Sequence, residues 1–299
     1  MSGPVGLVGI GLMGTALAGR MLGAGLRVVG FDLDPARRKA LAGMGGRPVD
    51  ALLDLAACRS VVLCVMNTAQ VEAVLEGDGG LIASAPRDGV HRIAICTATC
   101  EPGRIAALAE RIEARGWSLV DAPVSGSSVQ AARGDGLGLV SGRPEAVAAV
   151  ATVLEAIYPA RRDLGPAGNG TRAKLVINLM LGLNRAALAE GLAFAEAIGL
   201  DPAATLDVAR ASAAWSQVMD VKGDKMVAGD VAAQGKISQH LKDVRIMMDE
   251  AAAAGGELAL GARLAEVLEG AMAAGEGDFD NSAVIREFRR RLGRTPARV

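Results

Sequence analysis

Short runs rich in Val and Ile alternate with longer segments rich in Ala and Leu from Pro4 to about Leu164. Such runs are typical of strands buried on both faces of a parallel sheet, and the segments between them are long enough to be crossover helices. Two segments end at Gly25 and Gly116, where glycine permits a left-handed cap. The alternation predicts a doubly wound α/β domain with right-handed crossovers. We expect strands at residues 5–8, 27–31, 60–65, 92–96 and 118–120, and helices at 15–23 and 102–115.

The pattern changes after Gly165-Pro166-Ala167-Gly168-Asn169-Gly170, a cluster of residues that break helices and strands. Beyond it there is no convincing strand pattern, and the chain continues in long segments rich in Ala, Leu and Met. The first segment, from Thr171 to about Ile198, is long enough to connect two domains. We therefore predict two domains, residues 1–164 and 165–299, of which the second is all-helical. Further helices are expected at residues 203–211, 239–254, 258–274 and 282–292.

Charge and aromatic content disfavour several classes of partner. The 299 residues carry 32 Lys and Arg against 33 Asp and Glu, a net charge of −1. The net charge therefore provides no general electrostatic attraction to nucleic acid or to an anionic membrane. Four Phe, two Trp and one Tyr are too few for a base-stacking platform. No stretch has the 18 apolar residues of a membrane span, and the uncharged first 19 residues lack the basic region of a signal peptide.

The cysteine and histidine content also disfavours a bound metal. The four cysteines form no CxxC pair, and with only two histidines the ligand set of a structural zinc site is missing. Cys96 and Cys100 are close enough in sequence to face each other, but free cysteines behave mainly as small buried hydrophobes. We expect a soluble, cytoplasmic protein with reduced thiols and no metal.

A glycine-rich turn follows the first predicted strand and opens the first predicted helix. It reads Gly9-Ile10-Gly11-Leu12-Met13-Gly14, the G-x-G-x-x-G pattern in the strand, turn and helix context that dinucleotide binding requires. Glycines allow the tight turn and the close approach of a pyrophosphate, which lies on the free N–H groups of the helix start. We interpret these six residues as a dinucleotide-binding loop rather than a plain connection.

Asp32 ends the second predicted strand, about 20 residues after the glycines. A carboxylate there can accept hydrogen bonds from both ribose hydroxyls of NAD, and it repels the 2′-phosphate of NADP. Arg37 and Arg38 follow closely and soften that repulsion. The sequence thus favours NAD over NADP as the cofactor.

Four motifs occur in order along nearly the whole chain. They are the glycine loop with Met13 inside it; Asp121-Ala122-Pro123-Val124-Ser125-Gly126-Ser127 followed by Arg133-Gly134; the run from Gly165 to Lys174 with Asn178; and Lys242-Asp243. In these motifs the sequence resembles the β-hydroxyacid dehydrogenase family, which includes 3-hydroxyisobutyrate dehydrogenase, tartronate semialdehyde reductase and L-threonate dehydrogenase.

The resemblance carries expectations about architecture and partners. It implies a Rossmann-like NAD(P)-binding N-terminal domain and an all-α C-terminal domain, joined by a long interdomain helix. It also implies a cleft between the domains that takes a small hydroxy acid or its semialdehyde, and a homodimer or homotetramer built through the helical parts.

Lys174 and Asn178 are polar residues beside an apolar run, and they are four positions apart, so they share one face of a helix. Without the resemblance, a purely structural role for both residues is as acceptable as a functional one. Lys174 would then extend to the surface, and Asn178 would be a core residue bonded to a backbone carbonyl. With the resemblance, Lys174 occupies the position of the family's catalytic lysine and acts as the general acid and base. Asn178 then orients the reacting oxygen.

The run Ser125-Gly126-Ser127 is implied to supply N–H groups and hydroxyls to a substrate carboxylate. Here the chain departs from the family, which has glycine where Ser127 and Gln130 stand and leucine where Gly136 stands. Ser127 adds a side chain to the pocket wall, so these departures affect the identity of the substrate more than the type of reaction.

The remaining predicted site residues contact the cofactor or line the pocket. Thr97 matches the family's nicotinamide-side threonine, and Val65-Met66 stands where a cofactor-contacting loop commonly has Leu-Pro. Lys242 matches a lysine near the cofactor, with Asp243 as its partner; the alternative is a solvated charge pair. Trp215 is a candidate lid or pocket-wall residue of the helical domain, and core packing is an equal alternative.

Three other functions stay open at this point. A non-catalytic NAD-binding or scaffold protein would share the fold, but it is expected to lose the lysine that is present here. An imine reductase typically replaces this lysine, and a decarboxylating sugar-phosphate dehydrogenase has a considerably longer helical domain. The segments at residues 130–134 and 281–284 lean toward the threonate subgroup.

Overall fold

The computed structural model describes residues 3–294, which divide between two compact units, Met1–Lys174 and Leu175–Val299. The division falls within one helix, α9 (Asn169–Ala197), which begins in the first unit and continues in the second. Its first six residues, 169–174, therefore belong to the sheet-containing unit, and the rest belongs to the helical unit.

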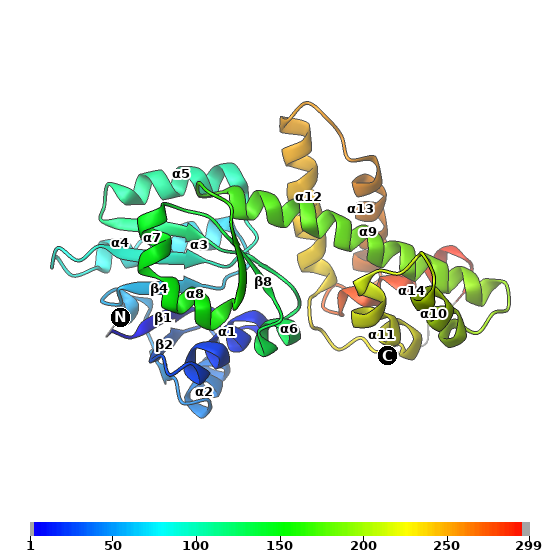
Figure 1. Ribbon diagram of the computed structural model, residues 1–299, viewed down its shortest axis with the longest axis horizontal. Helices are drawn as coiled ribbons and strands as arrows, with labels where there is room; N and C mark the ends of the chain where they lie inside the picture. Colours follow the sequence, from blue (N-terminus) through cyan, green and yellow to red (C-terminus); the bar gives the residue numbers. More distant parts are fainter. Residues whose placement is uncertain (1–2, 295–299) are drawn as a thin grey trace. The chain divides into compact units, whose positions relative to one another are not determined.

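The first unit is built on a six-stranded, all-parallel sheet in the order β3-β2-β1-β4-β5-β6 (Figure 1). This is the strand order of a doubly wound, dinucleotide-binding sheet, and it confirms the predicted fold class. All five predicted strands are present, and the sixth, β3, is too short to leave a pattern in the sequence. The strands are β1 (Val5–Val8), β2 (Val28–Phe31), β3 (Arg47–Pro48), β4 (Ser60–Leu63), β5 (Arg92–Cys96) and β6 (Trp117–Asp121).

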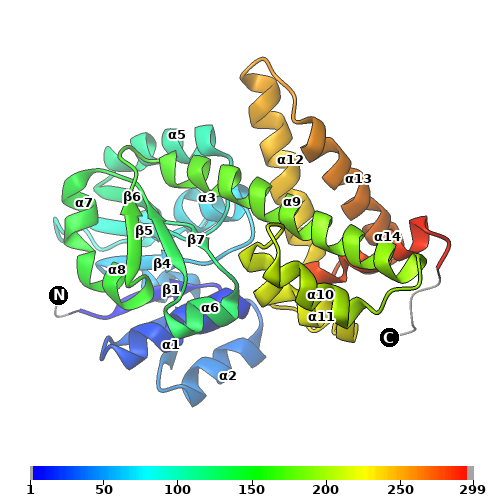
Figure 2. The same cartoon turned by 45° about the vertical axis from the view of Figure 1, so that its right-hand side comes forward.

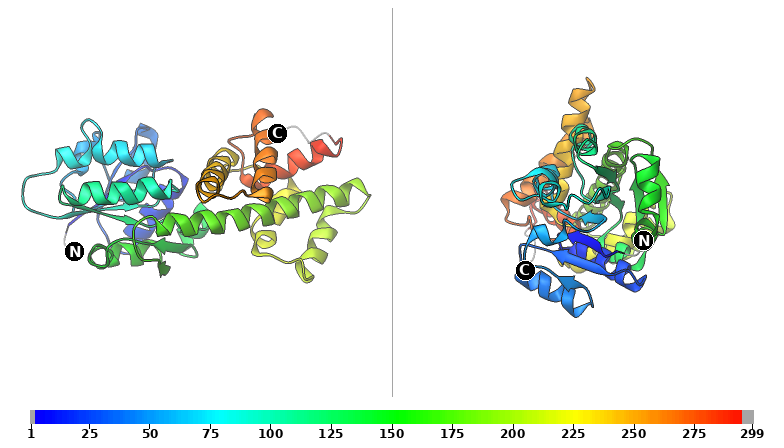
Figure 3. Two further views of the ribbon diagram at one scale, coloured as in Figure 1. Left: turned by 90° about the horizontal axis from the view of Figure 1, so that it is seen from above. Right: turned by 90° about the vertical axis from the view of Figure 1, so that its left-hand side faces the viewer.

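Helices cover both faces of this sheet, as Figure 3 shows from above. On one face Leu17 and Met21 of α1 are fully buried, and on the other face Ile105 and Leu108 of α5 are fully buried. Burial on both faces explains why the strands read as continuous apolar runs. The helices are α1 (Leu12–Gly23), α2 (Pro35–Gly43), η1 (Leu52–Leu55), α3 (Thr68–Glu76), α4 (Leu81–Ser84), α5 (Pro102–Glu113), α6 (Ser128–Arg133), α7 (Pro144–Ala149) and α8 (Ala151–Ile157).

A second, three-stranded sheet, which the sequence did not predict, follows the main one. It consists of β7 (Val124–Ser125), β8 (Leu137–Val140) and β9 (Ala160–Asp163), with β7 antiparallel and β9 parallel to β8. Its strands are short, and β8 contains Gly138, where a Cβ would lie 2.6 Å from the ring of Tyr158. The glycine is needed for that contact, but in the sequence it resembles a loop signal.

The second unit is helical, and between residues 165 and 294 the structure contains no strand, as predicted. Figure 2 shows α12 and α13 side by side, and both contribute apolar side chains to the core of this unit. Besides α9, the elements are α10 (Pro202–Ala211), η2 (Met219–Gly223, a π-helical turn), α11 (Asp224–Ala228), α12 (Ile237–Ala253), α13 (Ala259–Ala273), η3 (Asn281–Val284) and α14 (Ile285–Arg291).

Helix α9 is long and apolar enough to cross a membrane, judged by length and composition alone, although we expected no such segment from the sequence. A core helix of a soluble protein satisfies the same criteria, but only 33% of the most apolar stretch is buried inside the protein, so burial does not identify the helix as one. The helix carries Arg172, Lys174 and Arg185. We therefore interpret it as the predicted interdomain helix.

Candidate active site

The glycine loop lies between β1 and α1, at the carboxyl edge of the parallel sheet. Gly9 has a φ of +89°, and a Cβ there would lie 2.4 Å from the carbonyl oxygen of Cys64. At Gly14 a Cβ would lie 2.0 Å from the Gly9 carbonyl oxygen, so this glycine lets the helix approach the strand. A Cβ at Gly11 would meet only the Arg37 guanidinium, at 3.8 Å. The space over Gly11 is therefore open for a phosphate to approach the start of α1, and the loop fits a dinucleotide.

Asp32 follows β2 and fixes this loop. Its Oδ2 accepts a hydrogen bond from the Ile10 N–H at 2.6 Å, and its Oδ1 accepts one from the Asp34 N–H at 2.9 Å. The carboxylate is only 7% exposed, and the Arg37 guanidinium lies 3.5 Å away. The structure thus places a carboxylate beside the glycine loop, with one arginine close to it.

Two further predicted cofactor segments follow the next strands of the sheet. Val65 and Met66 come after β4, and the Met66 N–H donates to the Gln70 side chain at 2.8 Å. Thr97 comes directly after β5, and its hydroxyl donates to the Leu63 carbonyl at 3.0 Å. Because the carboxyl ends of neighbouring parallel strands meet at one edge of the sheet, both segments lie at the same edge as the glycine loop.

The segment Ser125-Gly126-Ser127 connects β7 to α6. Gly126 has a φ of +146°, a conformation that L side chains rarely adopt. The Ser127 hydroxyl accepts from the Gln130 N–H at 3.3 Å, and the Gln130 side chain accepts from the Ser127 N–H at 2.9 Å. These two bonds form a capping box for α6. The two residues that depart from the family pattern, Ser127 and Gln130, therefore bond to each other and form this cap together.

The predicted catalytic pair lies on α9. Lys174 is 8% exposed and Asn178, one helical turn later, is 9% exposed. The Asn178 amide donates to Asp243 Oδ2 at 2.9 Å, and the Lys242 ammonium lies 2.9 Å from Asp243 Oδ1. Asp243 thus joins Asn178 to Lys242, a link between α9 and α12 that sequence reasoning missed.

Trp215 follows α10 in the helical unit. The residue is 54% exposed, and its indole N–H donates to Asp220 at 3.2 Å. The alternative of a core tryptophan is therefore wrong, and its role as a pocket-wall residue stays a prediction.

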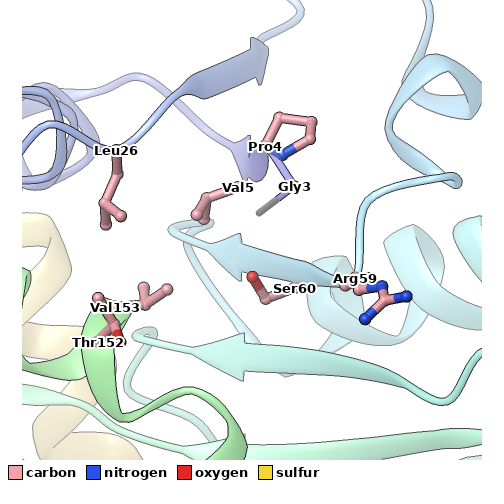
Figure 4. Close-up of a pocket in the computed structure, with 8 residues that line it drawn as sticks. All are labelled: Gly3, Pro4, Val5, Leu26, Arg59, Ser60, Thr152 and Val153. Carbon is pink, nitrogen blue, oxygen red and sulfur yellow. The ribbon is translucent and has the colours of Figure 1, made fainter. Parts of the chain in front are cut away.

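A hollow drawn in Figure 4 lies at the opposite edge of the sheet, next to the amino ends of β1 and β4. Its walls include Val5, Ser60 and Val153 and none of the predicted site residues. In doubly wound sheets ligands bind at the carboxyl ends of the strands, so this hollow is not the candidate site. Among residues 3–294 no three His, Cys, Asp or Glu side chains are grouped so that they could hold a metal.

Two family models cover most of the chain. Residues 4–161 match the NAD binding domain of 6-phosphogluconate dehydrogenase. Residues 168–288 match the NAD-binding domain of NADP-dependent 3-hydroxyisobutyrate dehydrogenase.

Individual proteins match over the full length. The chain is 35% identical over 290 residues to an L-threonate dehydrogenase from Cupriavidus necator, covering 96% of this chain and 97% of that protein. It is 32% identical to the probable 3-hydroxyisobutyrate dehydrogenase-like 2, mitochondrial, of Arabidopsis thaliana, covering 97% and 94%. The crystal structure of a 3-hydroxyisobutyrate dehydrogenase from Salmonella typhimurium matches with a TM-score of 0.87 at 29% identity, covering 95% and 99%.

Proposed function

The chain belongs to the β-hydroxyacid dehydrogenase family of NAD(P)-dependent oxidoreductases that act on CH–OH groups, and on that premise we propose a specific reaction. The protein is an NAD-dependent dehydrogenase of a small β-hydroxy acid or its semialdehyde, with Lys174 as the general acid and base. The observation that carries this proposal is the burial of Lys174 and Asn178 one turn apart on α9.

In this reaction different residues of the chain transfer the proton, orient the substrate and bind its carboxylate. In oxidation the neutral amine of Lys174 takes the proton of the substrate hydroxyl, and in reduction its ammonium returns a proton to the same oxygen. Asn178, held by Asp243, orients that oxygen, and Ser125 and Gly126 bind the substrate carboxylate. The nicotinamide, when bound, accepts or donates the hydride.

Cofactor choice follows from Asp32. Its buried carboxylate repels the 2′-phosphate of NADP and accepts hydrogen bonds from the ribose hydroxyls of NAD. For the substrate, the 35% identity to an L-threonate dehydrogenase makes L-threonate the first compound to test, and 3-hydroxyisobutyrate the second.

Replacing Lys174 with Ala tests the mechanism. We expect kcat to fall about 10²- to 10⁴-fold, the usual contribution of a positioned acid or base, while the Kd for NAD changes less than about threefold. The assay is NADH absorbance with L-threonate, 3-hydroxyisobutyrate and glycerate. Lys236→Ala is the control, because Lys236 forms a surface ion pair with Asp278 in the helical unit. Turnover that survives in the Lys174 variant would contradict the proposed role.

The same assay distinguishes the alternatives. A non-catalytic scaffold would bind NAD in calorimetry and show no turnover with any hydroxy acid. An imine reductase would instead oxidise NADPH with a cyclic imine. The presence of a buried lysine at position 174 favours the dehydrogenase over both.

A cytoplasmic location and self-association complete the proposal. The four cysteines are free thiols, which suits a reducing compartment. Val176, Met180 and Phe194 are exposed apolar residues on one face of α9, which supports a homodimer or homotetramer formed through the helical unit. Light scattering of the purified protein checks this expectation, and a monomer at micromolar concentration would contradict it.

A further inference from the structure

The carboxylate of Asp121 lies where the parallel sheet meets the first turn of α9, and it is fully buried. Its Oδ1 accepts a hydrogen bond from the Thr171 hydroxyl at 2.8 Å, and its Oδ2 accepts one from the Thr171 N–H at 2.8 Å. The Ser141 hydroxyl donates to Oδ2 at 3.1 Å. One carboxylate therefore holds both the backbone and the side chain of the third residue of the helix.

The backbone next to Thr171 is held as well. The Gly170 N–H donates to the Ser141 hydroxyl at 2.8 Å. A Cβ at Gly170 would lie 2.4 Å from the Leu139 carbonyl oxygen and 2.9 Å from that of Asp121. Glycine is thus required for the start of α9 to approach the ends of β6 and β8 this closely. The first turn is fixed to the sheet by charge-assisted hydrogen bonds and by close packing.

This anchor lies beside three segments of the candidate site. In the sheet register Asp121 pairs with Cys96, the residue before Thr97. Ser125 is four residues further along the chain from Asp121. Lys174 follows Thr171 by three positions on the same helix, a spacing at which Cβ atoms are about 5–6 Å apart. The position of Lys174 relative to the sheet therefore depends on the turn that Asp121 holds.

Stability alone does not account for a carboxylate at this position. Burial raises the pKa of Asp121 to about 6, and hydrogen bonds from Thr171 and Ser141 offset only part of that effect. A buried charge destabilises the folded state unless it is fully compensated. What the carboxylate provides is two acceptor oxygens in one plane, which orient the helix start.

We propose, on the basis of the function proposed above, that Asp121 is a positioning residue that sets the place of the Lys174 amine by holding Thr171. It touches neither substrate nor cofactor. A misplacement of about 1 Å at a reacting group can lower the rate about a hundredfold, so loosening the anchor is expected to reduce kcat.

Thr171→Val is the first test, because valine has nearly the shape of threonine and lacks the hydroxyl that donates to Asp121. We expect kcat to fall at least about tenfold, while KM for the hydroxy acid and Kd for NAD stay within about threefold of the wild-type values. Thr171→Ser restores the hydroxyl and is expected to recover most of kcat. The matched control is Thr205→Val, at the start of α10, where the hydroxyl donates to the Asp201 carbonyl.

A second experiment asks whether the effect passes through Lys174. Methylamine is added to Lys174→Ala to replace the missing amine, with and without Thr171→Val. Because the free amine is not attached to α9, we expect Thr171→Val to cause no further loss in the residual or amine-restored turnover. Thermal unfolding of every variant identifies general loss of the fold.

The outcomes separate the two proposals. Wild-type turnover in Lys174→Ala would overturn the proposed function. An inactive Lys174→Ala together with wild-type kcat in Thr171→Val would overturn only the positioning role. A tenfold further loss on adding Thr171→Val to amine-restored Lys174→Ala would also overturn it, because the anchor would then act on something other than Lys174.

Discussion

Asp32 and Asp121, two buried aspartates at the carboxyl edge of the parallel sheet, each hold the segment that lies next to them. Asp32 bonds the glycine loop through the N–H of Ile10, and Asp121 bonds the start of α9 through Thr171. The difference between them is access. Asp32 lies beside the open space over Gly11, where the proposed cofactor would approach, whereas Asp121 is enclosed by protein.

Replacing Asp32 with Asn removes the charge and keeps one oxygen acceptor. We expect the ratio of kcat/KM for NAD to that for NADP to fall at least about tenfold, because no like charge then opposes the 2′-phosphate. Asp34→Asn is the control, since Asp34 is the exposed cap of α2 and asparagine caps helices equally well. A wild-type enzyme that prefers NADP would show that Asp32 does not select the cofactor.

The raised pKa of Asp121 has a pH consequence. Burial is the main cause of the shift to about 6, and the neighbouring Cys96 and Tyr158 have raised pKa values, so they stay neutral near pH 7. The folded state binds this proton more tightly than the unfolded chain, whose carboxyl has a pKa of about 3.9. Its stabilising contribution is therefore present below about pH 4 and is lost as the pH rises through about 6.

Urea unfolding of the wild type and of Asp121→Asn from pH 5 to pH 8 measures this effect. The wild-type free energy of unfolding, relative to that of the variant, is expected to decrease by roughly 1–2 kcal/mol over this range. A difference independent of pH would mean that Asp121 titrates elsewhere.

At the scale of elements, the segment of residues 125–127, proposed to bind the substrate, also stabilises the start of α6 through its capping box. Ser127 ends the segment proposed to bind the substrate, and its hydroxyl caps a helix of six residues. The hydroxyl proton remains available to donate. A side chain that the family pattern lacks at this position is therefore held in a defined orientation by the backbone N–H of Gln130, which donates to the Ser127 hydroxyl.

Ser127→Ala is expected to lower the free energy of unfolding by about 1 kcal/mol, because the cap is lost. Ser127→Gly, which restores the residue of the family pattern, is expected to lower it by only a few tenths of a kcal/mol, since glycine is tolerated at the cap position. Chemical denaturation measures both values. Equal losses in the two variants would show that the hydroxyl does not stabilise the helix start.

At the scale of the whole molecule, both units have apolar cores. The first has apolar layers on both faces of its sheet, and the second encloses a buried ion pair in addition to its apolar core. There the Lys222 ammonium lies 2.8 and 3.0 Å from the two carboxylate oxygens of Asp280. Burial by itself would raise the pKa of Asp280, but its interactions with Lys222 and with the N–H groups of Gln234 and Ser282 together outweigh burial and lower the pKa.

Asp280→Ala is expected to destabilise the protein by about 3–5 kcal/mol, because it leaves the buried Lys222 ammonium without a counter-charge, with only the Gln234 side-chain oxygen as acceptor among residues 3–294. Asp278→Ala, two residues away, removes an exposed ion pair with Lys236 and is expected to cost less than about 1 kcal/mol. Urea unfolding of the two variants makes the comparison. Equally small effects would show that Lys222 finds other partners or loses its proton at little cost.

Much of this architecture is predictable from local patterns. Five of the six strands of the main sheet follow from hydrophobic patterning, because a strand buried on both faces needs an unbroken apolar run, and the helical character after residue 165 follows from the loss of such runs. The glycine loop and Asp32 were also evident, since their spacing along the chain is itself the requirement for binding a dinucleotide. The short strands β7 to β9 were missed because their pairing depends on distant partners and leaves little local pattern.

The sequence alone determined which chemical groups the candidate site has: the glycine loop, the Asp32 carboxylate, the serines of residues 125–127 and Lys174. Each of them is recognisable from its neighbours in the sequence. Only the tertiary structure decided which of them are connected. Asp121 lies 50 residues from Thr171, and Asn178 lies 65 residues from Asp243. A hydrogen bond between such residues depends on how strands and helices pack, and packing has no signature in the neighbouring residues. The anchor beneath Lys174 therefore became visible only in three dimensions.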